Sequence, residues 1–169
     1  MKKVLSTERL LIREFNRDDW EDVCAMNTDA EVMQTIGNGK VGTIEEEKSG
    51  FENILLSYKT GKGLGVWAVT TLSKTFIGAA SMTLLGNTGE VQIGYRFQKE
   101  YWGQGYATEV TKALVEYGFN QLKLKRIVAT TNLDNEKSKH VLEKSGLRFQ
   151  KTTTFYGLEM DYFAIELPG

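Results

Sequence analysis

The sequence contains very few of the residues on which several common kinds of site depend. Among its 169 residues there is one cysteine, Cys24, and one histidine, His140. A single cysteine excludes a disulfide within the chain and is typical of the reducing cytoplasm. A structural zinc site takes about four cysteine and histidine ligands, so we expect no metal here. The chemistry must then depend on carboxylates, hydroxyls and backbone amides.

Long apolar runs and an excess of charge of one sign are also missing. The formal net charge is −1, and charges of both signs are mixed along the chain, which argues against a nucleic-acid groove or an anionic membrane surface as partner. The apolar runs are far shorter than the ~20 residues of a membrane span. The N-terminus lacks the apolar region of a signal peptide. We expect one cytoplasmic domain over residues 1–169.

The order of periodic segments predicts a mixed α/β fold. Apolar residues alternate in some segments and recur every three or four residues in others. Thr43 and Glu46 have the spacing of a capping box, and Asn16 or Asp18 can cap an earlier helix. Strands are expected at 10–12, 64–70, 75–85, 90–97, 126–131, 147–155 and 162–167, and helices at 20–27, 43–58, 107–117 and 135–145.

Residues 90–119 form the stretch around which the rest is organised. Val91 and Ile93 begin an alternating strand, Gly103 and Gly105 lie in a short loop, and an amphipathic helix follows. The first N–H groups of a helix lack partners and carry partial positive charge, and glycine lets a phosphate approach them closely. A tight turn that merely needs glycine explains the same residues, so this alternative stays open.

Two widespread phosphate-binding motifs do not fit this loop. The chain has no G-x-x-x-x-G-K-[ST], and Gly103-Gln104-Gly105 is not followed by the third glycine of a Rossmann fingerprint. Residues 102–107, WGQGYA, resemble the pyrophosphate loop of GNAT-superfamily acyltransferases, [Q/R]-x-x-G-x-[G/A], with tryptophan in place of Gln or Arg. The longer string IGYRFQKEYWGQGYATE resembles the RimJ/RimL branch, the type that contains ribosomal-protein N-terminal acetyltransferases.

The resemblance covers nearly the whole chain and implies the GNAT fold. This is a twisted mixed sheet of six or seven strands flanked by about four helices, with a splay between the fourth and fifth strands. Acetyl-CoA would be the cosubstrate, with no metal. The residues that the resemblance implies for cofactor binding are Tyr95, Arg96, Phe97, Trp102, Gly103, Gln104, Gly105, Tyr106, Ala107, Thr108, Asn135 and Ser138.

The helix expected at 135–145 carries the first candidate catalytic residue. Ser138 shares its apolar face, so its hydroxyl needs a hydrogen-bond partner, and a carbonyl one turn earlier would suffice. By resemblance to the family's acetyl-CoA motif, Asn135 would bond the pantetheine and Ser138 would protonate the departing thiolate. Leu142 stands where many family members carry a tyrosine acid, which rules out that mechanism at this position. His140 falls on the solvent face, and we assign it no role.

The second candidate catalytic residue is a proton acceptor, because an amine can attack the thioester only in its neutral form. Glu90 is the expected proton acceptor, two residues before Gln92, where relatives often carry Glu. A surface charge at a strand end explains Glu90 equally well. Glu31, Glu159 and Asp161 are further carboxylates that the sequence does not rank. The oxyanion would accept a bond from a backbone N–H between Ile93 and Tyr95.

The sequence therefore predicts an N-acetyltransferase. It would transfer an acetyl group from acetyl-CoA to a primary amine, a small molecule or a protein N-terminus, by direct attack in a ternary complex. The alternative is a non-catalytic acyl-CoA sensor with the same fold, and a protein that binds another nucleotide is a third reading. Cys24 is predicted to be a core residue with no thiol chemistry. The chain would be a monomer or a homodimer.

Overall fold

Eight strands form one sheet in the computed structural model, which describes residues 2–169. Their order is β1-β2-β3-β4-β5-β6-β8-β7, and only β5 and β6 are parallel neighbours. The strands are β1 (Lys3–Ser6), β2 (Leu10–Arg13), β3 (Gly65–Thr71), β4 (Phe76–Leu84), β5 (Val91–Phe97), β6 (Arg126–Asn132), β7 (Arg148–Phe155) and β8 (Leu158–Glu166). The mixed α/β fold that the sequence predicts is confirmed.

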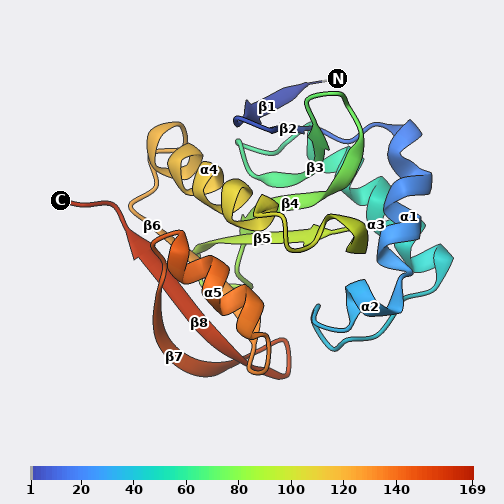
Figure 1. Ribbon diagram of the computed structural model, residues 1–169. Helices are drawn as coiled ribbons and strands as arrows, with labels where there is room; N and C mark the ends of the chain where they lie inside the picture. The colour runs from blue at the N-terminus through green and yellow to red at the C-terminus, as the bar shows by residue number, and fades with distance from the viewer. Residues whose placement is uncertain (1) are drawn as a thin grey trace.

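The helices lie on both faces of this sheet. They are α1 (Trp20–Asn27), α2 (Ala30–Met33), α3 (Ile44–Ser57), α4 (Tyr106–Asn120) and α5 (Glu136–Lys144), with short 3-10 turns at Arg17–Asp19 and Lys99–Tyr101. Figure 1 shows α4 and α5 together on one face. Among residues 2–169, no helix is both long and apolar enough to cross a bilayer.

Two elements were not predicted, and each has a weak sequence signal. Strand β1 contains only two apolar residues, Val4 and Leu5, and both are half-buried because β1 is an edge strand. Helix α2 has four residues, too few for a periodic pattern. Because β1 adds one strand before the first predicted one, the fourth and fifth predicted strands, at 90–97 and 126–131, are β5 and β6. The predicted splay lies between these two strands, which are paired at one position only.

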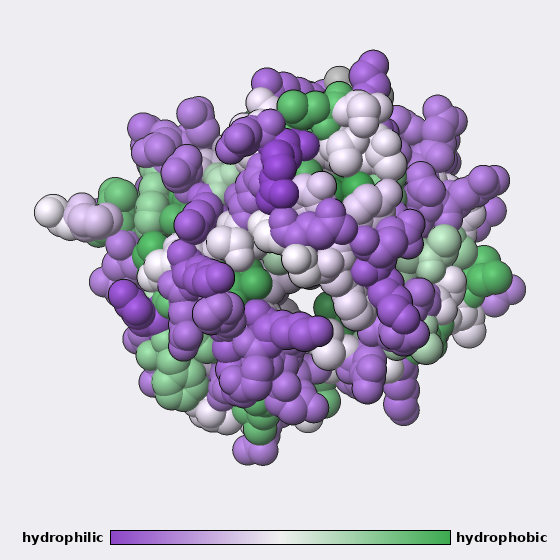
Figure 2. Space-filling model, in the orientation of Figure 1, coloured by the Kyte–Doolittle hydropathy of each residue, from purple (hydrophilic) through white to green (hydrophobic). Residues whose placement is uncertain are grey.

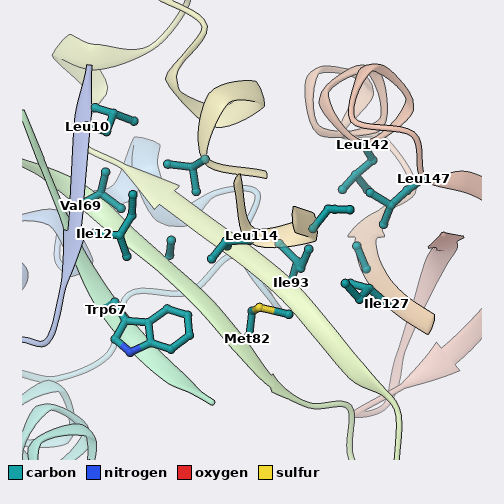
Figure 3. Packing of buried hydrophobic residues seen from close by; sticks show 14 of the residues in the cluster. Leu10, Ile12, Trp67, Val69, Met82, Ile93, Leu114, Ile127, Leu142 and Leu147 are labelled. Carbon is teal, nitrogen blue, oxygen red and sulfur yellow. The ribbon is translucent and has the colours of Figure 1, made fainter. Parts of the chain in front are cut away.

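The main core lies between the sheet and the helices α4 and α5. Figure 3 shows this cluster, in which Ile93 and Met82 of the sheet pack with Leu114 of α4. Val91, Ile93 and Phe97 are buried, as the alternation in β5 predicts. A smaller cluster on the opposite face joins Phe15, Val23 and Phe51, and so fixes α1 and α3 there. Because both faces are covered, β5 is held in the middle of the molecule.

The ends of the helices follow the predicted capping chemistry. The Thr43 hydroxyl accepts from the Glu46 N–H and the Glu46 carboxylate accepts from the Thr43 N–H, a complete capping box at the start of α3. Before α1, Asn16 rather than Asp18 is the cap, and it caps the 3-10 turn that leads into the helix. After α5, Gly146 adopts a φ of 92°, the left-handed geometry that ends many helices.

Candidate functional site

The two edges of β5 are paired very differently. Toward β4 the strand is paired at seven positions, from Leu84↔Val91 to Gly78↔Phe97. Toward β6 it is paired at one position, Gln92↔Val128, after which the strands diverge. The backbone groups of residues 93–97 that face β6 are therefore free of a strand partner and can bond an extended ligand. Figure 2 shows an opening in the molecular surface beside α5, in the region where these strands separate.

The glycine loop connects this unpaired stretch to α4. Gly103 and Gly105 have φ of 72° and 80°, so both positions need the left-handed conformation that glycine adopts without strain. Gly105 is the N-cap of α4 and offers no side chain to the first N–H groups of the helix. These donors and the helix dipole face the end of β5 and can hold an anion. The predicted order of strand, loop and helix is confirmed.

Residues of the turn between β1 and β2 hold this loop in place, which the sequence did not indicate. Arg9 donates from Nη1 to the Gln104 carbonyl (3.0 Å) and from Nε to Glu109 (2.7 Å), and its guanidinium lies 4.4 Å from the centre of the Tyr106 ring. The Thr7 hydroxyl also donates to Glu109. Burial raises the pKa of Glu109, but the bonds from Thr7 and Arg9 outweigh it and hold that pKa below its usual value.

A hydrogen bond from the indole of Trp102 fixes the start of the loop. Trp102 replaces the Gln or Arg of the family pattern, and its Nε1 donates to the carbonyl of Phe97 at 2.9 Å. The indole remains 42% exposed. Trp102 therefore connects the loop to the last residue of β5.

A hydrogen bond joins β5 to α5 beside the edge of β5 that is not paired with β6. The Tyr95 hydroxyl donates to Ser138 Oγ at 3.2 Å, so Ser138 points toward the sheet as predicted, but its partner is a phenol rather than a carbonyl of its own helix. Burial raises the pKa of Tyr95 and the bond to Ser138 offsets only part of this rise, so the phenol keeps its proton at neutral pH. The alternation of β5 placed Tyr95 on this face, but no local pattern indicated its contact with Ser138.

Asn135 starts the helix that carries Ser138. Its Oδ1 accepts from the Ser138 N–H at 3.1 Å, which makes Asn135 the N-cap of α5. The side-chain oxygen of Asn135 is thus engaged in capping α5, and its amide nitrogen is the group that can donate to a ligand. Leu142, one helical turn after Ser138, is 2% exposed and belongs to the core. His140 is exposed, as the helix periodicity predicts, whereas Cys24, which was expected in the core, is only half-buried.

The predicted proton acceptor, Glu90, lies at the other end of β5. Its Oε1 accepts from Tyr162 (2.7 Å) and from Arg126 Nε (3.2 Å). An extended strand rises by about 3.3 Å per residue, so Glu90 and Tyr95 are about 17 Å apart along the chain. The structure therefore does not bring Glu90 into contact with the pair Tyr95–Ser138, and a proton would reach it only through water.

Two of the other candidate carboxylates are also paired. Asp161 accepts from Lys139 of α5 (2.8 Å) and from Thr152 (2.6 Å), and mainly the Lys139 contact holds the pKa of Asp161 below its usual value. Glu31 is paired with Lys99 at the surface. Within residues 2–169 there is no group of three or more histidines, cysteines and acidic residues that could hold a metal ion. The chemically distinctive groups are thus the open strand, the loop and the Tyr95–Ser138 pair.

Comparisons with protein families, curated sequences and solved structures all identify GNAT acetyltransferases as similar to this chain. The profile described as "Acetyltransferase (GNAT) domain" matches residues 9–148. The uncharacterized N-acetyltransferase YnaD of Bacillus subtilis is 33% identical over 145 residues, covering 85% of this chain and 82% of YnaD. The crystal structure of a GNAT-family acetyltransferase from Bacillus anthracis has a TM-score of 0.81 at 30% identity, covering 96% of this chain and 97% of that one.

A third comparison concerns the RimJ/RimL branch that the sequence resembles. The structure of RimL, a ribosomal alpha-N-protein acetyltransferase, in complex with coenzyme A has a TM-score of 0.81 and covers 98% of both chains. Its sequence identity to this chain is 15%, so it shows a shared fold alone.

Proposed function

Since the chain belongs to the GNAT acetyltransferase family, we propose that it transfers the acetyl group of acetyl-CoA to a primary amine by direct attack in a ternary complex. The observation that supports this most directly is the unpaired edge of β5, which lies between the open N-terminus of α4 and Ser138. A new C–N bond forms as the thioester C–S bond breaks, so the groups around this edge must bind the cofactor and move two protons.

The residues at this edge fit the cofactor that the family uses. The backbone N–H groups of residues 103–108 would hold the pyrophosphate, because the N-terminus of α4 is uncapped and both glycines permit close approach. The free edge at residues 95–97 would pair with the amides of the pantetheine, and the Asn135 amide nitrogen would donate to it. A backbone N–H between Ile93 and Tyr95 would stabilise the charge that develops on the carbonyl oxygen.

The Tyr95–Ser138 pair supplies the proton that the departing sulfur needs. In our proposal Ser138 Oγ–H protonates the thiolate, and the Tyr95 hydroxyl, bonded to Ser138 at 3.2 Å, replaces that proton. The Tyr95 phenolate then takes a proton back from water, which balances the proton that the amine releases to water. This arrangement substitutes for the tyrosine that Leu142 excludes. The amine would lose its proton to water on the way to Glu90, whose assignment as final acceptor rests on the sequence pattern.

Other features of the proposal rest on the sequence. Membership of the RimJ/RimL branch is favoured by the string at residues 93–109, and a cytoplasmic location and a monomeric or homodimeric state stay predictions. The alternative function, an acyl-CoA sensor without turnover, is not favoured, because relatives such as YnaD are named N-acetyltransferases.

Thermal unfolding with acetyl-CoA, CoA, ATP and NAD tests the proposed ligand. A ligand at about 100 times its Kd stabilises the native state by about 2.7 kcal/mol, so acetyl-CoA and CoA should raise Tm by several degrees. ATP and NAD should not. The absence of a shift with millimolar CoA or acetyl-CoA would contradict the proposal.

A thiol-reactive dye then separates an enzyme from a sensor. Amine-dependent release of CoA is expected, whereas a sensor would bind acetyl-CoA without releasing thiol. The Cys24→Ala variant is the matched control, since it removes the chain's own thiol from the signal.

A further inference from the structure

Arg96 forms no salt bridge with any carboxylate in the part of the chain that the structure describes, residues 2–169. It follows Tyr95 on β5, so its side chain points to the opposite face of the sheet, where Nη1 donates to Oδ1 of Asn27, the last residue of α1, at 2.6 Å. Its Nε is shielded from solvent and has no hydrogen-bond partner among residues 2–169. The acidic residue whose charge acts on Arg96 is Glu47, but its carboxylate accepts from the Asn27 amide instead.

The other arginines show how unusual this is. The guanidinium of Arg13 is more deeply buried than that of Arg96, but it makes two bonds of 2.7 Å to the buried carboxylate of Asp19. Arg9, Arg17 and Arg126 are each paired with a glutamate, and Arg148 is exposed to water. Burial lowers the pKa of Arg96, and the charge of Glu47 offsets only part of that effect. A cation that is largely withdrawn from water and lacks a carboxylate invites an anionic ligand.

The position of Arg96 indicates what that ligand is. Residues 93–97 form the open edge of β5, and the loop, Ser138 and Tyr95 all lie toward α4 and α5. If the cofactor binds on that side, the acceptor amine would approach the acetyl group from the side of Arg96 and Asn27, where α1 ends. Asn27 occupies only one of the five N–H donors of the guanidinium.

We propose that Arg96 binds a carboxylate of the acceptor, so that the preferred substrates are amines that bear a carboxylate near the amino group, such as amino acids or short acidic peptides. A guanidinium pairs with a carboxylate through two parallel bonds, which would place the neighbouring amine beside the open edge of β5. The same charge repels polyamines, which would enter this face as polycations. This inference rests on the proposed function, because it assigns the acceptor side of the same site.

The role of Arg96 is tested by measuring CoA release with acceptors that differ only in carrying a carboxylate or the corresponding amide. The probes are alanine and alaninamide, the dipeptides Ala-Glu and Ala-Gln with blocked C-termini, and spermidine. The wild-type kcat/KM should be at least tenfold higher for the acid member of at least one pair. Arg96→Gln should remove this preference by lowering kcat/KM for the acid alone, and Arg96→Lys should keep part of it. Arg148→Gln, an exposed arginine, is the control and should change neither.

The outcomes separate this inference from the proposed function. Turnover of neutral amines or spermidine as fast as of the acids, or an equal loss for both pair members in Arg96→Gln, would overturn the role of Arg96 and leave the acetyltransferase intact. Thermal shifts with the same pairs in the presence of CoA give a readout that needs no turnover. Only the acids should stabilise the wild type, and stabilisation by acid and amide alike would refute the inference.

Discussion

The two edges of β5 differ strongly in how far they are paired with their neighbouring strands. The edge toward β4 is paired along its length and is covered by buried side chains such as Ala80 and Met82. The edge toward β6 is paired once and is bordered by polar groups from the loop and α5. One strand thus stabilises the sheet through one edge and presents its free backbone groups through the other. The account predicts that changes at the first edge alter stability, whereas changes at the second alter binding and turnover.

The largest effect is expected at the paired edge, in Gly78→Ala. A Cβ on this buried residue would lie 2.3 Å from the carbonyl oxygen of Arg96, so the two strands must move apart. We expect the free energy of unfolding to fall by about 3 kcal/mol, measured by urea denaturation. Gly50→Ala is the matched control: nothing lies within 4 Å of its added Cβ inside α3, and it should be neutral or slightly stabilising. Equal stability of both variants would contradict the close packing of this edge.

The next largest effect is expected at the open edge, in Ser138→Ala. Losing the proton donor should lower kcat about 100-fold, while the Kd of acetyl-CoA and Tm change little. Tyr95→Phe, which keeps the ring and removes the hydroxyl, should reproduce part of this loss because Ser138 is then not reprotonated by the phenol. Ser57→Ala, an exposed serine at the end of α3, controls for loss of a hydroxyl. Parallel losses of kcat and cofactor affinity in Ser138→Ala would leave Ser138 a structural residue.

A smaller effect is expected in the loop, in Gly105→Ala. Its φ of 80° strains any residue with a Cβ, so the loop should relax away from the geometry that holds the pyrophosphate. The Kd of acetyl-CoA should rise at least tenfold, about 1.4 kcal/mol, by calorimetric titration. Gly89→Ala is a matched control with a φ of 77°, open space around the Cβ and a position outside the loop. An unchanged Kd in Gly105→Ala would show that the loop is a structural turn and does not bind the cofactor.

The smallest effect is expected away from both edges, in Cys24→Ala. Cys24 is half-buried in α1 and contributes no group to the proposed site. Turnover should fall less than tenfold, which is less than about 1.4 kcal/mol of barrier. A larger loss of kcat at saturating substrates would indicate thiol chemistry that the proposed mechanism does not contain.

The sequence predicted the parts of the site that are encoded locally. The alternation of β5, the two glycines before α4, the capping box at Thr43 and the direction of Ser138 all depend on residues a few positions apart. The contacts that complete the site join distant residues. Tyr95 and Ser138 are 43 positions apart, Arg96 and Asn27 are 69 apart, and Arg9 and Glu109 are 100 apart. Such pairs follow from how the elements pack, so no local period indicates them.

The fold shows the same division. Strands with alternating apolar residues were found, and the missed strand β1 is held mainly by its pairing with β2 at the sheet edge. The divergence of β5 and β6 also left no local signal in the sequence and entered the prediction through family resemblance alone.

Hydrogen exchange of the backbone amides, with and without CoA, tests the central claim most directly. If the open edge of β5 and the loop hold the cofactor, CoA should slow exchange in peptides covering residues 93–97 and 103–108. Peptides from β3 and β4, whose amides are already paired, should exchange at unchanged rates. Stabilisation of the protein by CoA without new protection at residues 93–97 and 103–108 would contradict the account.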